Sequence, residues 1–174
     1  MMRYLILSLW ALLSFLLNGT VFLQVSIFGI QLDMILASLV VMTYLEKTLT
    51  PTFYMAGAAF LQDILFSKVL GFYTLQYVVI GLTLYLFVRN RRNHVVYAGI
   101  AGALSYILRD LLGLLLCLLI DVKKPFFLQI YRYALPGALL AALFTMLIYL
   151  IGTRIYRYRF MRPLLPDDLQ QEEL

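Results

Sequence analysis

Residues 50–92 read TPTFYMAGAAFLQDILFSKVLGFYTLQYVVIGLTLYLFVRNRR, and this stretch indicates the fold class of the whole chain. It holds two apolar segments joined by a turn at Gly71, with a single carboxylate, Asp63, inside the first segment. About 20 apolar residues are enough for a helix to cross the ~30 Å hydrocarbon core of a bilayer. An ionisable group at that depth costs at least ~2.5 kcal/mol and is usually retained for a partner or a function. The stretch therefore predicts a membrane hairpin with a buried Asp.

The composition of the whole chain agrees with this interpretation. Of its 174 residues, 63% are hydrophobic and 13% are charged, and the mean hydropathy is +0.90. Soluble domains carry about 25% charged residues. The composition predicts one all-α integral membrane domain, with no room for a soluble catalytic or nucleotide-binding domain. The net charge of +5 does not indicate nucleic-acid binding, because Lys and Arg lie between and after the apolar segments, where they orient helices in a lipid bilayer.

The apolar segments predict six transmembrane helices, at about residues 4–23, 33–45, 51–67, 72–88, 95–120 and 136–151. Six crossings put most of the Lys and Arg residues on the side of the N-terminus, so the positive-inside rule places both termini in the cytoplasm. Residues 1–163 would form this domain. The acidic residues 164–174 are expected to be a disordered cytoplasmic tail, and 24–32 an outer loop that leads to Asp33 as the N-cap of the second helix.

Small residues and prolines indicate turns and close helix contacts. Glycine permits a tight turn, and it also lets two helix backbones approach each other in lipid. Proline is tolerated in the first turn of a helix, so the last helix is expected to begin at its proline. The residues to which we assign turn or packing roles are Gly57, Gly71, Gly99, Gly102 and Pro136.

Apart from Asp33, the expected N-cap, only three charged residues lie within the predicted spans: Asp63, Arg109 and Asp110. No metal-ligand cluster, phosphate-binding loop or nucleophile motif accompanies them, so we predict no catalytic, metal-binding or cofactor-binding residue. The depths of Asp63 and Arg109 differ by roughly 9 Å, which a long Arg side chain and helix tilt can cover. We expect an interhelical ion pair between them, beside Asp110. It could lock two helices, contact a partner, or line a proton or ion pathway.

The segment AGAAFLQDILFSKVLGFYTLQYVVIGLTLYLF, with Gly57, Asp63 and Gly71 at these spacings, resembles the rod shape-determining protein MreD family. The resemblance extends to the Asp before the second helix, the basic cluster after the fourth, and Arg132 followed by Pro136 before the sixth.

Two positions depart from the family pattern. Leu32 stands where the family has a proline, and Ala141 stands where it has a polar Asn. Neither departure removes a catalytic group, because the family is not enzymatic.

The resemblance implies a non-enzymatic scaffold subunit of the bacterial cell-elongation complex in the cytoplasmic (inner) membrane. Its direct partner would be the bitopic protein MreC, and MreB, RodZ, RodA and the elongation penicillin-binding protein would be reached mostly through it. The family fold is similar to that of the substrate-binding subunits of energy-coupling-factor transporters, so a vitamin-binding transporter subunit is the alternative. Such a subunit needs several convergent polar groups, whereas the outer halves of these helices offer little beyond Asp63, Gln62, Gln76 and Arg109.

The residues that follow Gly71 predict the partner-binding surface. Phe72, Tyr73, Gln76 and Tyr77 combine aromatic rings with an amide and could contact a partner's transmembrane helix and its periplasmic stem. An aromatic belt at the lipid–water interface is the alternative interpretation. The sequence leaves the oligomeric state open, including a homodimer.

Overall fold

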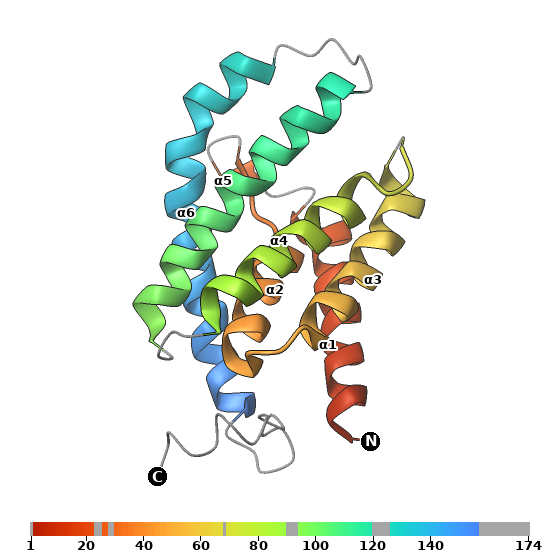
Figure 1. The fold of residues 1–174 in the computed structure, drawn as a ribbon, viewed down its shortest axis with the longest axis vertical. Coiled ribbons are helices and arrows are strands. Elements are labelled where there is room, and N and C mark those ends of the chain that lie inside the picture. The colour runs from red at the N-terminus through yellow and green to blue at the C-terminus, as the bar shows by residue number, and fades with distance from the viewer. Residues whose placement is uncertain are drawn as a thin grey trace.

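The computed structural model describes residues 2–22, 26–27, 30–67, 69–89, 94–119 and 126–156. Six α-helices dominate this part of the chain (Figure 1). They are α1 (Met2–Leu17), α2 (Met34–Glu46), α3 (Thr50–Phe66), α4 (Phe72–Val88), α5 (Val95–Leu119) and α6 (Phe126–Tyr156). A π-helical turn, η1 (Asn18–Phe22), follows α1, and the short antiparallel strands β1 (Ser26–Ile27) and β2 (Ile30–Gln31) precede α2. The expected tail, 164–174, lies outside the described residues.

The observed helix bounds differ from the predicted ones at two places. α4 covers the predicted span 72–88, but α1 ends at Leu17 and passes into η1, and the expected loop 24–32 contains the strand pair. α6 begins at Phe126, so Pro136 lies inside the helix instead of opening it. Proline removes one backbone hydrogen bond there. The helix continues through it because the other backbone groups of an apolar helix have their best partners within the same helix.

α2 forms the centre of the bundle. It contacts each of the other five helices, and all of its residues except Leu45 are buried. A helix that is apolar on every side is expected to be surrounded by others. With 13 residues, α2 is about 20 Å long, which is shorter than the ~30 Å hydrocarbon core of a bilayer.

Three helices are long and apolar enough to cross a membrane, over Arg3–Thr20, Val95–Leu118 and Ala134–Tyr156. Met34–Glu46 and Phe72–Val88 are apolar but shorter. The outward faces of the long helices carry exposed leucines, such as Leu9 at 60% and Leu118 at 75% exposure. Contiguous apolar surface of this kind is typical of proteins that contact lipid or other proteins.

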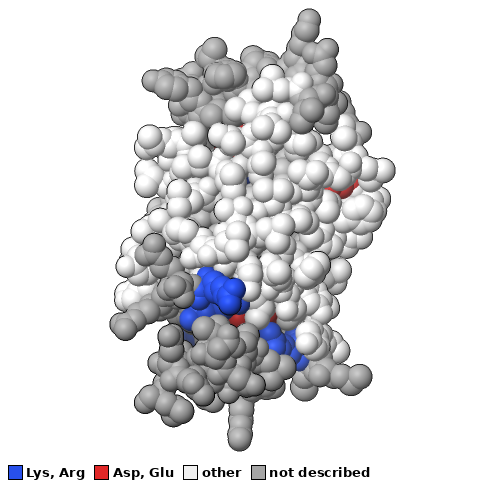
Figure 2. Space-filling model, viewed as in Figure 1, with Lys and Arg blue, Asp and Glu red and all other residues white. Residues whose placement is uncertain are grey.

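The start of α1 and the ends of α2, α4 and α6 lie at one end of the molecule, which we call the base (Figure 1). The described charged residues at these helix ends are Arg3, Glu46, Lys47, Arg89 and Arg154. Figure 2 shows the larger Lys and Arg patches of one face toward this end, below a broad uncharged surface. Glu46 is fully buried there. It pairs with Arg3 at 3.1 Å and accepts a hydrogen bond from the Tyr156 hydroxyl at 2.9 Å. These contacts fasten α1, α2 and α6 together at the base.

Close packing between α5 and α6 depends on glycine. A Cβ atom at Gly99 would overlap a methionine side chain of α6, and one at Gly102 would overlap a threonine side chain of the same helix. Gly57 has nothing within 4 Å of its Cβ position and lies on the exposed side of α3, so its predicted role in helix packing is wrong. The buried side of α3 is instead formed by residues such as Ala59 and Asp63.

Candidate functional site

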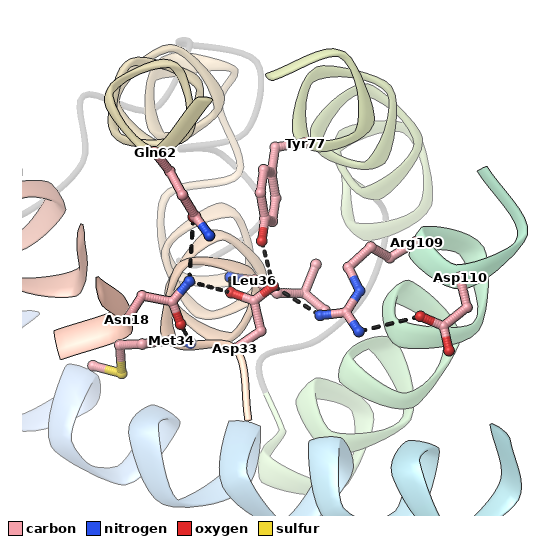
Figure 3. A network of polar contacts seen from close by, with 8 residues as sticks. All are labelled: Asn18, Asp33, Met34, Leu36, Gln62, Tyr77, Arg109 and Asp110. Carbon is pink, nitrogen blue, oxygen red and sulfur yellow. Dashed lines mark hydrogen bonds and ion pairs between the residues drawn. The ribbon is translucent and has the colours of Figure 1, made fainter. Parts of the chain in front are cut away.

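A network of polar side chains converges on Asp33, at the N-terminus of α2 (Figure 3). Asp33 caps α2 by accepting a hydrogen bond from the Leu36 backbone N–H at 3.1 Å, as the sequence predicts. Its Oδ2 also accepts from Arg109 Nη1 at 2.8 Å and from the Tyr77 hydroxyl. A carboxylate in an apolar interior is tolerated when it is both paired and hydrogen-bonded. Asp33 meets both conditions.

Asn18, the first residue of η1, extends the network toward α1 and α3. Its Nδ2 donates to Asp33 Oδ1 at 3.4 Å and to Gln62 Oε1 at 3.3 Å. Its Oδ1 accepts from the Met34 backbone N–H at 3.2 Å. Asn18 is only 7% exposed. Side chains from five helical segments, η1, α2, α3, α4 and α5, therefore meet in one cluster (Figure 3).

Arg109 is shared by two carboxylates. Its Nη2 donates to Asp110 Oδ1 at 3.1 Å while Nη1 is bound to Asp33. Its Cζ lies 4.7 Å from the centroid of the Tyr106 ring, which is within cation–π range. The planar guanidinium carries several donors in a fixed fork, so it can serve both acids at once. This arrangement crosslinks α5 to α2.

Asp63 belongs to a second, separate polar site at the other end of the bundle from the base. Its Oδ1 accepts from the Tyr73 backbone N–H at 2.9 Å, and its Oδ2 accepts from the Thr74 N–H at 2.8 Å and the Thr74 hydroxyl at 2.6 Å. Gly71, at φ +87°, is the N-cap of α4 and has no side chain to offer. Asp63 of α3 therefore supplies the cap, with its charge at the positive end of the α4 dipole.

The ion pair predicted between Asp63 and Arg109 is wrong, because Asp63 binds the start of α4 and Arg109 binds Asp33 and Asp110. Depth does not separate the two residues, since each lies about 20 Å along its helix from the base. Asp63 and Arg109 are separated by the lateral positions of their helices. α3 packs on α1, α2 and α4, whereas α5 packs on α2, α4 and α6. Sequence reasoning identified Asp33 only as a cap. Asp33 lies as far from the base along α2 as Arg109 does along α5, and this equal depth was the signal in the sequence that could have paired the two residues.

The four predicted partner contacts divide into two pairs. Phe72 and Tyr73 are half-buried, and their rings make an edge-to-face contact with centroids 5.4 Å apart. Gln76 and Tyr77 are 2% and 1% exposed and lie inside the bundle, so the prediction that they contact a partner is wrong. Tyr77 binds Asp33, and the Gln76 side-chain nitrogen has no hydrogen-bond partner in the described structure. The turn at Gly71 sets the rotation of α4 that points both side chains inward.

Two cavities lined by described residues lie near the polar network and along the outer side of the bundle. One, of ≈ 10 Å³, adjoins Asp33 and Tyr106 between α2, α5 and α6, and has room for about one water molecule. The other, of ≈ 90 Å³, is an apolar groove between α4 and α5. In the part of the chain that the structure describes, no three His, Cys, Asp or Glu side chains are grouped to hold a metal ion. The hydrogen bonds and ion pairs of the polar network join side chains of different helices.

Comparisons of the chain with models of known protein families, with curated proteins and with solved structures found no match. No relative therefore supplies an activity or a partner for this chain.

Proposed function

We propose that the chain is a non-enzymatic scaffold subunit of the bacterial cell-elongation complex, of the MreD type, which binds MreC in the cytoplasmic membrane. The observation that carries the proposal is the α3–α4 hairpin, in which Asp63 caps α4 across the Gly71 turn. Both residues belong to the segment that resembles the MreD family. Asp63 and Gly71 together fix the shape of the hairpin. A charged residue at membrane depth is costly and is usually retained for a structural or functional contact, which the cap provides.

In this proposal all six helices cross the membrane and both termini are cytoplasmic, in a fold similar to the substrate-binding subunits of energy-coupling-factor transporters. The base supports this orientation because it gathers Arg3, Lys47, Arg89 and Arg154 at the start of α1 and at the ends of α2, α4 and α6 (Figure 1). Positive residues favour the cytoplasmic side. The 13 residues of α2 and the 17 of α3 and of α4 reach only about 20–25 Å, so their far ends would lie below the outer membrane surface.

The buried network suits a scaffold because it fixes helices relative to one another. Asp33, Arg109 and Tyr77 connect α2, α5 and α4, and Asn18 connects α1 and α3 to them. A satisfied polar network in a low-dielectric interior specifies one arrangement of the elements that carry it. A partner would therefore meet a surface of constant shape.

The proposed MreC-binding surface lies on the last turns of α3 and the start of α4. It consists of the half-buried Phe72 together with exposed apolar residues, namely Leu61, Ile64, Leu65 and Leu70. Association of helices in lipid depends on side-chain packing, since lipid tails are as apolar as leucine. MreB, RodZ, RodA and the elongation penicillin-binding protein would be reached through MreC.

Co-purification of MreC from membranes in which both proteins are expressed tests the proposal. Leu65→Trp alters the proposed surface, and Leu139→Trp makes the same change on α6 at a position of matched exposure, 63% against 62%. We expect MreC recovery to fall several-fold with Leu65→Trp and to stay unchanged with Leu139→Trp. Equal recovery of MreC with both variants would mean that MreC binds a different surface of the chain.

Failure of the wild-type chain to recover MreC at all would refute the scaffold function. Saturable binding of a small molecule, without any protein partner, would then favour the vitamin-binding alternative. That outcome would require a larger site than the described cavities of ≈ 10 and ≈ 90 Å³, since small-molecule pockets usually measure about 300–1,000 Å³.

A further inference from the structure

We infer that the chain thins the outer leaflet of the membrane beside the α3–α4 hairpin, so that lipid headgroups descend to the turn at Gly71. The partner of this surface is the lipid bilayer itself, compressed by about 5 Å on one side of the protein. The inference rests on the membrane orientation of the proposed function but not on MreC binding, and it concerns the chain without a partner.

The neighbouring helices α4 and α5 differ in length. α4 has 17 residues and α5 has 25, which correspond to about 25 Å and about 37 Å. α4 ends at Val88 and α5 begins at Val95, so both helices extend from the same end of the molecule, and the outer end of α5 lies farther from the base (Figure 1). α3 also has 17 residues. The hairpin is therefore about 5 Å shorter than the ~30 Å hydrocarbon core of an undeformed bilayer, whereas α5 can cross all of it.

The exposed surface of α5 is apolar through the full depth of that core. Leu111 and Leu115 are 56% and 51% exposed. They lie about 24 Å and about 30 Å from the start of the helix. Exposed leucines at these heights are stable in hydrocarbon, because their transfer to water is unfavourable. The bilayer beside α5 therefore keeps its full thickness.

The turn of the α3–α4 hairpin is not suited to hydrocarbon. The described residues between Phe66 and Phe72 are not helical, and Leu70 among them is 71% exposed. The Ser67 hydroxyl donates to the Val69 carbonyl at 2.8 Å, but within the described part of the chain no hydrogen bond involves the backbone groups of Leu70. Lipid-exposed backbone outside a helix does not occur in the hydrocarbon region, because its polar groups have no partner there. The turn must therefore lie at the level of headgroups and water.

Thinning is the adjustment that satisfies both sides of the protein. A bilayer adapts to a short hydrophobic segment by becoming thinner around it, at a modest cost. Moving the whole chain outward by about 5 Å would also bring the turn to the surface, but it would draw Lys47 and Arg89 at the base into hydrocarbon. Charged side chains are costly there. The outer leaflet beside the hairpin is the part of the system that yields.

The depth of single positions in vesicles tests the inference. Leu70→Cys and Leu111→Cys are made in the full-length chain with Cys117→Ala, labelled with bimane, and reconstituted into dioleoyl phosphatidylcholine. Leu111 is the matched control, because it is also exposed and lies about 24 Å along α5, close to the ~25 Å height of the turn. Each sample is quenched with lipids that carry a nitroxide either on the headgroup or in the middle of the tail.

We expect the headgroup nitroxide to quench bimane at position 70 several-fold more strongly than the tail nitroxide does, and the order to be reversed at position 111. In the thinner bilayer of dilauroyl phosphatidylcholine no compression is needed. Both positions should then be quenched mainly from the headgroup, and the difference between them should disappear.

Stronger quenching by the tail nitroxide at both positions in dioleoyl vesicles overturns the inference, as does a difference of equal size in the two kinds of vesicle. Quenching of position 70 by neither lipid also overturns it, and assigns the turn to a water-filled crevice or to contact with a second copy of the chain.

Leu115→Cys tests the membrane orientation separately. This residue lies about 30 Å from the start of α5, so the headgroup nitroxide should quench it in dioleoyl vesicles. If it does not, the proposed orientation fails and the inference fails with it. If it does while position 70 is quenched from the tail, the orientation stands and the thinning alone is refuted.

Discussion

Asp33→Asn is the substitution that tests the buried network most directly. Asn has the shape of Asp and is an equally good N-cap, so the hydrogen bond from the Leu36 N–H can persist and α2 keeps its cap. What is lost is the negative charge that Arg109 pairs with at 2.8 Å. The effect therefore reports the ion pair and not the start of the helix.

The expected loss of stability follows from how completely Arg109 is left without a counter-charge. Breaking a buried ion pair by removing one partner costs about 3–5 kcal/mol. Arg109 keeps Asp110 at 3.1 Å, and its side chain is 19% exposed, so part of the penalty is relieved. We expect a cost of about 2 kcal/mol, which corresponds to a fall of roughly 4–8 °C in the melting temperature of a chain of this size.

The assay is a double-mutant cycle with Arg109→Met, followed by thermal unfolding of the purified protein in detergent. Side chains in direct contact show interaction energies of about 0.5–3 kcal/mol, and we expect about 2 kcal/mol for Asp33 and Arg109. A parallel cycle that combines Asp63→Asn with Arg109→Met should be additive to within ~0.5 kcal/mol. Additivity in the first cycle together with coupling in the second would refute the network and restore the Asp63–Arg109 pair.

Three further predictions concern the helix contacts and the orientation of the chain. Asp63→Ala should cost about 1–3 kcal/mol in thermal unfolding, because buried N–H groups at the start of α4 lose their acceptor; an unchanged melting temperature would contradict the cap. Gly102→Ala should lower the free energy of unfolding by about 1–3 kcal/mol, because its Cβ would overlap a threonine side chain of α6. Gly57→Ala, whose Cβ meets nothing, should be neutral or stabilise the protein by up to ~1 kcal/mol. Equal effects of the two substitutions would contradict the packing of α5 on α6. In a cysteine-free background, His94→Cys should resist an impermeant thiol reagent in intact cells, and Lys123→Cys, which follows the 25-residue helix α5, should react. The reverse labelling would invert the proposed topology.

The helices were largely predictable, because each is determined locally by the length of an apolar run and by the glycine, proline or charged residues that bound it. The span 72–88 is α4, which begins immediately after Gly71 and ends immediately before Arg89. The start of α6 was not predictable in the same way, because Pro136 marks a favoured helix start without requiring one. Pro51 does lie in the first turn of α3, so a proline marked one helix start correctly and the other incorrectly.

The candidate site was only partly predictable, because a sequence gives depth along each helix but not which helices are neighbours. Arg109 and Asp110 were identified from their position inside an apolar span, and Asp63 by the same argument. All of these residues do make polar contacts, but Asp63 and Arg109 make them with different helices. The burial of Tyr77 was missed for a related reason, since the rotation of α4 about its axis depends on how the Gly71 turn joins it to α3.

The short central helix and the buried network are two aspects of one constraint. An N-cap carboxylate is normally solvated, and an Asp before a helix is then no more than a boundary signal. α2 is only about 20 Å long, and it is fastened at the base through Glu46, so its N-terminus lies within the bundle and Asp33 is largely withdrawn from solvent. A charge in that position requires a counter-charge and donors, which Arg109, Tyr77 and Asn18 provide. Lengthening α2 by one turn would move Asp33 about 5 Å away from these partners, so the ion pair with Arg109 depends on the length of the helix.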